Sequence, residues 1–395
     1  MKIRTVDAIP VRLTRDLAAA SGTAGSPSQL RPGDSGYRWS ETVPALYSQY
    51  FETALVKIVL DDGRIGWGEA QAPLAPRVAC TIVQELLRPV LLDTEFDGSV
   101  DAVAALWDRM YGTMRVRGHS GSFMLDAIAG VDLALWDLAG QIQHQPVSAL
   151  ISAVAKTHVP AYISGLPASS VEERVETARR YMDCGFRHYK LYYERDERSL
   201  FDLLDALRGS LGSSAELAVD ALWRLDEASA VTFGRSLDER QALWLECPLW
   251  PEDVAAHARL AKEIRTPIAL GESYRTCHEL RPFFEAGVIR FVQPDLGRTG
   301  ITEAIRISGL AASFGAAVVP HLSIALGPQV AAAIHFAAAS ANCSLLEYNP
   351  SVLQMANRFL SKPITIEGPA YAVPDAPGLC PPVLEESLRS ENLFS

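Results

Sequence analysis

The stretch Ile268-Ala-Leu-Gly-Glu272 is a short apolar run that ends in a carboxylate, and a helical segment follows it. Ala316-Ala-Val-Val-Pro-His321 repeats the pattern with an imidazole at its end. Short apolar runs that alternate with helical segments are typical of a parallel sheet covered by helices. The chain from residue 159 onward is therefore predicted to consist of repeated βα units.

Eight such runs follow one another at a steady interval. Subtracting the numbers of their polar end residues gives spacings of 26, 30, 26, 26, 23, 26 and 26, for Ser164, Lys190, Asp220, Glu246, Glu272, Asp295, His321 and Glu347. Eight equivalent units favour a closed (β/α)₈ barrel over an open sheet. We assign this barrel to residues 151–350.

The chain before the barrel has a different pattern. Residues 1–13 and 53–70 read as strands, with a turn at Asp61-Asp62-Gly63, and helical periodicity follows at 77–92, 100–114 and 119–141. Residues 1–150 are therefore predicted to form a small α+β unit. Within it, residues 14–50 are dense in turn-forming residues and are predicted to be a long loop that acts as a mobile lid. Residues 351–395 are expected to pack back on this unit.

Composition limits the classes of function. Among 395 residues, 48% are hydrophobic and 21% are charged, which is typical of a folded globular protein. The formal net charge is -11 and no Lys/Arg run is present, so nucleic acid is not an expected partner. No apolar run reaches the length of a membrane span. The six cysteines include no Cys-x-x-Cys pair and follow no secretory segment, which predicts reduced thiols and a cytoplasmic protein.

Three consecutive runs end in the carboxylates Asp220, Glu246 and Glu272. In a barrel the carboxyl ends of the strands converge on one mouth, so these side chains are predicted to lie close together. Such a cluster must be protonated or bind a cation. All-oxygen ligation favours Mg²⁺ over Ca²⁺ or Zn²⁺. One acidic residue at such a position is more often a helix cap or a loop anchor, but three in succession favour a metal site.

The next two runs end in Asp295 and His321, which are predicted to lie side by side. A carboxylate beside an imidazole fixes its tautomer and raises its basicity, so His321 is a candidate general acid or base. The alternative is a hydrogen-bonded core histidine with no catalytic role.

Lys190 and Tyr192 lie on one face of the second strand because side chains alternate with a period of two. Lys190 is a candidate to hold a substrate carboxylate. The alternative is a lysine that extends to solvent and a tyrosine that packs under a helix. Glu347 completes the ring, as a hydrogen-bond donor if burial keeps it protonated.

With these residues, the chain resembles the mandelate racemase subgroup of the enolase superfamily (the mandelate racemase/muconate lactonizing enzyme family) over nearly its whole length. The resemblance rests on Gly66-Trp-Gly-Glu-Ala70, Asp132-Leu-Ala-Leu-Trp-Asp137, the three carboxylates, Gln293-Pro-Asp295 with Gly297 and Gly300, and His321. It implies a modified TIM barrel, (β/α)₇β, with an N-terminal α+β capping domain that the C-terminal segment completes. It also implies an Mg²⁺ enzyme that removes the α-proton of a small-molecule carboxylate to give a metal-stabilised enediolate, and a homo-oligomer.

Two departures from the subgroup bear on the reaction. Where relatives usually have Lys-x-Lys, this chain has Lys190-Leu-Tyr192, and a phenol with a pKa of about 10 is a poor base. Racemisation needs a base on each face of the α-carbon, so a dehydratase of an acid sugar or small hydroxy acid is the first hypothesis. In that reading His321 with Asp295 is the principal acid/base and Tyr192 is an auxiliary proton donor. Some acid-sugar dehydratases are similar in having a tyrosine at this position. Leu222-Trp223, where relatives often carry Asn, predicts a more apolar wall.

Two alternatives to a dehydratase stay open. One is a racemase, epimerase or cycloisomerase that acts on a carboxylate substrate. The other is a barrel that binds a ligand without catalysis.

Overall fold

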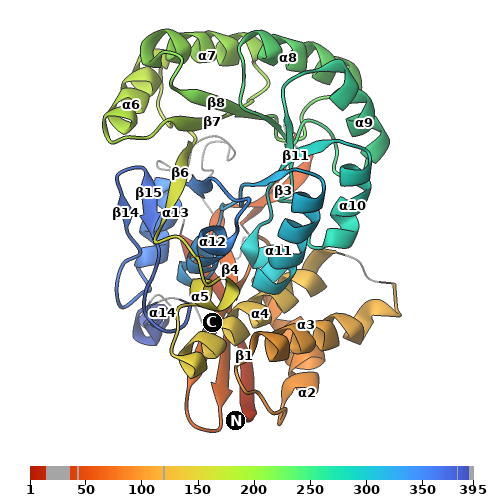
Figure 1. The fold of residues 1–395 in the computed structure, drawn as a ribbon, viewed down its shortest axis with the longest axis vertical. Coiled ribbons are helices and arrows are strands. Elements are labelled where there is room, and N and C mark those ends of the chain that lie inside the picture. Colours follow the sequence, from red (N-terminus) through yellow and green to blue (C-terminus); the bar gives the residue numbers. More distant parts are fainter. Residues whose placement is uncertain (15–35, 42–43, 119–120, 380, 391–395) are drawn as a thin grey trace.

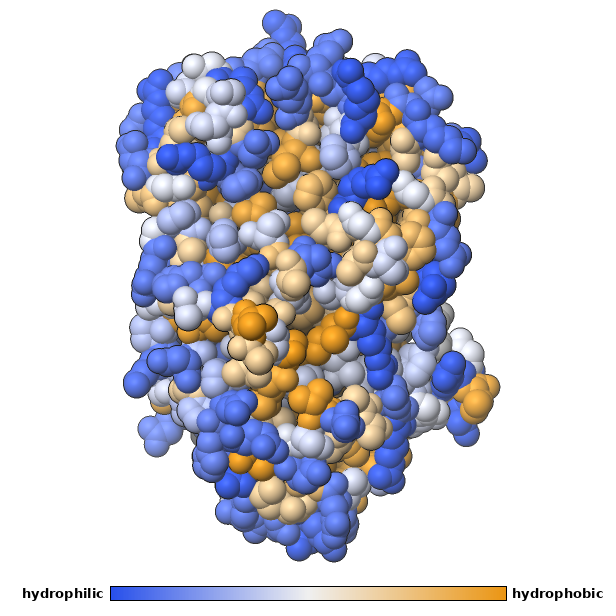
Figure 2. All heavy atoms as spheres, viewed as in Figure 1, coloured by the Kyte–Doolittle hydropathy of each residue, from blue (hydrophilic) through white to orange (hydrophobic). Residues whose placement is uncertain are grey.

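The computed structural model describes residues 1–14, 36–41, 44–118, 121–379 and 381–390. Figure 1 shows two parts, a barrel ringed by helices above and a smaller sheet with its own helices below. In the face that Figure 2 shows, hydrophilic residues dominate the upper and lower ends, and apolar residues gather between them. Among the described helices, none combines the length and the apolar content that a membrane span requires.

The lower part begins with an antiparallel sheet in the order β1 (Ile3–Thr14), β4 (Tyr50–Leu60), β5 (Ile65–Ala70). Its helices are α1 (Pro76–Ile82), η1 (Val83–Leu87), α2 (Arg88–Leu91), α3 (Val100–Arg115) and α4 (Ser122–Gln143). These elements confirm the predicted strands and helical segments. The helical segment predicted at residues 77–92 contains a π-helical turn, η1. The turn forms because Pro89 has no N–H to donate and its ring crowds the carbonyl four residues earlier.

Between β1 and β4, the described residues form a hairpin. β2 (Tyr37–Ser40) pairs antiparallel with β3 (Ala45–Ser48). The prediction of a loop throughout residues 14–50 is wrong here, because aromatic residues such as Tyr37, Trp39 and Tyr47 favour strands and the sequence reading weighed only the turn formers. Residues 15–35 and 42–43 of the predicted lid lie outside the described residues.

The upper part is a closed parallel barrel, as predicted. Its strands follow the order β12-β11-β10-β9-β8-β7-β6, and β13 pairs with β6. A bridge from Val318 to Cys343 joins β12 to the segment just before β13 and closes the ring. The strands are β6 (His158–Ser164), β7 (His188–Tyr192), β8 (Glu216–Asp220), β9 (Leu245–Glu246), β10 (Ile268–Leu270), β11 (Ile289–Val292), β12 (Ala317–Val318) and β13 (Leu346–Tyr348).

A helix follows each of the first seven strands, which confirms the (β/α)₇β architecture that the resemblance implies. These helices are α6 (Val171–Asp183), α7 (Glu197–Leu211), α8 (Glu227–Glu239), α9 (Val254–Glu263), α10 (Cys277–Glu285), α11 (Leu296–Ser313) and α12 (Gly327–Ala339). In Figure 1, α6 to α10 form the outer rim, and α11 and α12 lie on the side of the barrel that faces α4.

The last part of the chain contacts both units. It contains α13 (Pro350–Asn357), β14 (Ile366–Glu367), β15 (Ala370–Ala372) and α14 (Glu385–Ser390), and β15 pairs antiparallel with the start of β6. Further on, the Leu379 N–H donates to Asp137 on α4, and Lys57 on β4 lies 2.5 Å from Glu385. The division of the chain near residues 150 and 350 stays a prediction.

α4 connects the small sheet to the barrel, and both of its faces are closely packed. On the sheet side, a Cβ atom on Gly68 would lie 2.0 Å from the carbonyl oxygen of Gly130. On the barrel side, Asp132 accepts hydrogen bonds from the N–H (3.0 Å) and the hydroxyl (2.5 Å) of Thr302 on α11. The motif at residues 66–70 therefore packs the small sheet against α4, and Asp132 in the motif at 132–137 holds α4 against the barrel.

We expect Gly68→Ala to lower the free energy of unfolding by about 1–3 kcal/mol or more, because two backbone segments would have to separate. Gly112→Ala on α3 is the matched control, since a Cβ there meets nothing within 4 Å. The control should be neutral or stabilise the protein by up to about 1 kcal/mol. Urea denaturation of the three proteins measures both effects, and similar stabilities for the two variants would contradict the close packing.

His335 on α12 is fully buried and joins three segments of the chain. Its Nδ1 accepts a hydrogen bond from the N–H of Ser148 (3.1 Å), and its Nε2 lies 2.7 Å from the carbonyl oxygen of Leu379. This arrangement needs a neutral ring, because a proton on Nδ1 would point at an N–H. Burial accordingly lowers the pKa of His335 to about 4.

This pKa has a consequence for acid stability. In the unfolded chain a histidine has a pKa of about 6.5, so the unfolded state binds the extra proton as the pH falls from 6.5 to 4. His335 should therefore cost up to about 3 kcal/mol of stability across that range. Urea denaturation at several pH values should show a smaller acid loss for His335→Gln than for the unmodified chain. Parallel pH courses would show that the histidine is not held neutral.

Candidate active site

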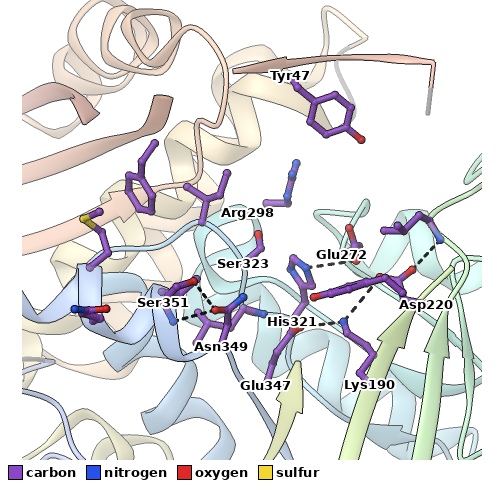
Figure 3. Close-up of a pocket in the computed structure, with 18 of the residues that line it drawn as sticks. Tyr47, Lys190, Asp220, Glu272, Arg298, His321, Ser323, Glu347, Asn349 and Ser351 are labelled. Carbon is purple, nitrogen blue, oxygen red and sulfur yellow. Dashed lines mark hydrogen bonds and ion pairs between the residues drawn. The ribbon is translucent and has the colours of Figure 1, made fainter. Parts of the chain in front are cut away.

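A cavity of about 600 Å³ lies at the carboxyl end of the barrel strands, where the barrel meets the smaller unit. Tyr47 and Phe51 reach it from the smaller unit, and all other lining residues come from the barrel or α13. The lining residues that Figure 3 labels include Lys190, Asp220, Glu272, Arg298, His321, Ser323 and Glu347.

The pairing of adjacent strands brings the three predicted metal ligands together. Asp220 on β8 is in register with Glu246 on β9, and Glu272 follows directly after β10. One carboxylate oxygen from each residue lies within 4.8 Å of the other two. The structure thus places the three carboxylates in one cluster.

This cluster fits a hard divalent cation. Burial and the charge of Glu246 raise the pKa of Asp220 well above its ordinary value, and burial raises that of Glu272. A cation among the carboxylates would relieve the repulsion that these shifts report. Asp220 Oδ2 and Glu272 Oε1 accept no hydrogen bond from the residues that the structure describes, so both stay open for a metal. The all-oxygen donor set suits Mg²⁺.

His321 and Asp295 form a hydrogen-bonded pair beside this cluster. The Nδ1 of His321 lies 2.8 Å from Asp295 Oδ2, while the other oxygen of Asp295 accepts from Gly297 N and Gln329 Nε2. Asp295 therefore fixes a proton on Nδ1 and turns Nε2 toward the cavity, 3.4 Å from Glu272 Oε2. Burial alone would lower the pKa of His321, but Glu272, Glu347 and Asp295 raise it to about 10.

Lys190 lies among the carboxylates and is 1% exposed. Its Nζ is 2.7 Å from Glu246 Oε1 and 2.9 Å from Glu347 Oε1. Burial would lower the pKa of Lys190, but these two carboxylates raise it well above its ordinary value. The alternative of a lysine that extends to solvent is wrong.

The surroundings of Glu347 favour its charged form, whereas the sequence allowed a donor that burial keeps protonated. Burial would raise its pKa, but the charges of Lys190 and His321 hold the pKa of Glu347 well below its ordinary value. It accepts hydrogen bonds from the hydroxyl of Ser164 (2.5 Å) and the N–H of Leu322 (2.8 Å). The expectation failed because it counted burial and omitted the lysine.

The Tyr192 hydroxyl lies 2.7 Å from the hydroxyl of Ser164. Ser164 has one hydroxyl proton and donates it to Glu347. The Tyr192 hydroxyl must therefore be the donor in its hydrogen bond with Ser164. Burial also raises the pKa of Tyr192 above its ordinary value. This phenol is therefore a poor base in the present arrangement.

Sequence reasoning missed the residues that support Asp295. Glu69, in the quoted motif at 66–70, is fully buried and accepts hydrogen bonds from the N–H groups of Leu326 and Gln329 at the start of α12. Gln329 in turn donates to Asp295. Burial raises the pKa of Glu69 to about 7. The motif at residues 66–70 pointed to Glu69. Its partners Leu326 and Gln329 are more than 250 residues away in the sequence, so no local pattern could connect them.

A cluster of three carboxylates beside an Asp–His pair, at the mouth of a (β/α)₇β barrel with an α+β cap, defines a class of enolase-like proteins. Two family models match this chain: "Enolase C-terminal domain-like" over residues 173–386, and "Mandelate racemase / muconate lactonizing enzyme, N-terminal domain" over residues 47–152. The chain belongs to the mandelate racemase/muconate lactonizing enzyme family of the enolase superfamily.

Curated relatives have different activities. The chain is 30% identical to a D-galactonate dehydratase of Ralstonia nicotianae, over 75% of this chain and 78% of the relative. It is 29% identical to a D-galactarolactone cycloisomerase of Agrobacterium fabrum, over 82% and 87%. A solved structure of an enolase superfamily member from Agrobacterium tumefaciens has a TM-score of 0.89 and 30% identity, covering 98% of each chain.

We expect Asp220→Asn and Glu272→Gln each to weaken Mg²⁺ binding by about 100-fold or more, because even residues that only support metal ligands contribute about 10–100-fold. Isothermal titration calorimetry with MgCl₂ measures this directly. Asp205→Asn is the control, since Asp205 pairs with Arg240 on the surface away from the cluster. Unchanged Mg²⁺ affinity in both ligand variants would show that the cluster holds no metal.

Proposed function

We propose that this protein is an Mg²⁺-dependent lyase that removes the α-proton of a hydroxy acid or acid sugar and eliminates water from it. The observation that carries this proposal is a one-sided arrangement of proton-transfer groups. His321 turns Nε2 into the cavity beside the carboxylate cluster, whereas the Tyr192 hydroxyl donates to Ser164 and has a raised pKa. A reaction that uses one group both as base and as acid fits this arrangement.

Each residue of the site would have a separate role. Lys190 supplies positive charge beside the substrate carboxylate, and Asp295 keeps the imidazole in the tautomer that accepts a proton at Nε2. Mg²⁺ held by Asp220, Glu246 and Glu272 would offset the negative charge that develops on the substrate and would lower the pKa of His321 toward neutrality.

His321 alone can carry out both proton transfers of the elimination. His321 takes the α-proton, and the C–H electron pair moves into the substrate carboxylate. The same proton returns from Nε2 to the β-hydroxyl as the C–O bond breaks, so that water leaves. The resulting enol becomes a 2-keto acid by tautomerisation, and His321 ends the cycle neutral.

Two relatives with dehydratase names, for D-galactonate and arabinonate, support this reaction class. The apolar side chains of Leu222 and Trp223 line the cavity and make part of its wall apolar. Cycloisomerisation is the second candidate, because it also needs a single base and a relative carries that name. Racemisation is disfavoured because Tyr192 is a poor second base. A purely binding role does not account for the His321–Asp295 pair.

Incubation with a library of hydroxy acids and acid sugars, with Mg²⁺ present, should yield a 2-keto acid from at least one compound. His321→Asn should reduce that turnover by about 10²–10⁴-fold, because it removes the acid–base group. Tyr192→Phe is the matched control and should change turnover by less than about 10-fold, since the phenol takes no proton. EDTA should stop the reaction.

The same samples in D₂O separate the candidates. Deuterium at the α-position with no keto acid would overturn dehydration in favour of cycloisomerisation or epimerisation. Equal losses in the His321 and Tyr192 variants would contradict the one-sided arrangement. No turnover and no exchange of any acid would favour the binding role.

A further inference from the structure

Arg298 is a cation in the cavity that the mechanism above does not use. It lies in the first turn of α11, three residues after Asp295, and its side chain lines the cavity. Its Nε is buried and has no hydrogen-bond partner, and no carboxylate among the described residues lies within 4.0 Å of its guanidinium. Its neighbour Arg275 differs, because it forms a forked pair with Asp126 at 2.9 and 3.2 Å.

An arginine in this situation requires an explanation. A guanidinium stays charged at any accessible pH, and a buried N–H group without a partner is costly. Two other basic groups of the catalytic end are already paired, Lys190 with Glu246 and Glu347 and His321 with Asp295. Arg298 is therefore available for a ligand group, and the planar fork of a guanidinium matches a carboxylate.

Neutral hydroxyl donors also line the cavity. The hydroxyl oxygen of Ser323 accepts a hydrogen bond from Gln71 Nε2 at 3.0 Å, which leaves the Ser323 proton free to donate. Tyr47 presents its hydroxyl above the cavity (Figure 3). A cation accompanied by hydroxyl donors is a suitable environment for an anion.

The position of Arg298 indicates which part of the substrate it would meet. In Figure 3, Arg298 and Lys190 lie on opposite sides of His321. The carboxylate next to the reacting carbon is expected near Lys190 and the metal ligands, so a group at Arg298 belongs to the far end of the substrate. We propose that Arg298 binds a second carboxylate, and that the substrates are sugar diacids or their monolactones rather than sugar monoacids. This inference rests on the proposed function for its assignment of the reacting end.

Binding to a protein that cannot turn over its ligand tests the inference. In the His321→Asn background with MgCl₂, calorimetry would compare matched diacid and monoacid pairs: galactarate with galactonate, glucarate with gluconate, and mannarate with mannonate. We expect at least one diacid to bind about 10–100-fold more tightly than its monoacid, the range of a charged hydrogen-bonded pair. Adding Arg298→Met should abolish that difference and leave the monoacid affinity nearly unchanged.

Two further variants make the result specific. Arg298→Lys keeps the charge without the fork and should retain part of the preference. Arg259→Met removes the same charge from a surface pair with Glu227 and should retain all of it. Thermal denaturation of each variant checks that the fold is intact.

Several results would overturn the inference. These are equal affinities within every pair, a diacid preference that survives Arg298→Met, and no binding of any acid. Failure of the proposed function has a different signature, because the unmodified chain would then bind diacids through Arg298 without forming a keto acid from them.

Discussion

The concentration of negative charge at the barrel mouth is the constraint on which the rest of the site depends. Five carboxylates meet there: Asp220, Glu246, Glu272, Asp295 and Glu347. Few of them could stay ionised without nearby positive charge. Lys190 is accordingly buried between Glu246 and Glu347, and His321 lies between Glu272 and Asp295. The remaining deficit of positive charge lies at the three aligned carboxylates, where a divalent cation fits.

The smaller unit helps to position Asp295 and His321 without contacting the reacting atoms. Glu69 holds the start of α12, and Gln329 on that helix holds Asp295. Asp132 fixes α4 against α11, the helix that begins directly after Asp295. The orientation of the imidazole thus depends on contacts between two units that are distant in the sequence. Close packing at Gly68 leaves little freedom for α4 to shift against the small sheet.

The sequence was sufficient for the architecture and for the choice of residues at the strand ends. The apolar runs recur at nearly equal spacing, and each polar end residue marks the point where a buried strand reaches the mouth. Sequence reasoning failed where the outcome depended on neighbours that are not sequence neighbours. It described residues 14–50 as loop although β2 and β3 pair within them, and it considered Glu347 as a donor that burial keeps protonated because Lys190 was not known to be 2.9 Å away.

The sequence by itself therefore determined the number and order of the barrel strands, the identity of the three carboxylates and the pairing of Asp295 with His321. It could do so because strand periodicity and parallel pairing bring residues at equivalent positions of adjacent strands together. Only the tertiary structure decided which pKa values are shifted, that Tyr192 donates its proton to Ser164, and that the Nε of Arg298 has no hydrogen-bond partner within the described chain. Charge and hydrogen bonding depend on distances across the barrel, and no local pattern in the sequence records them.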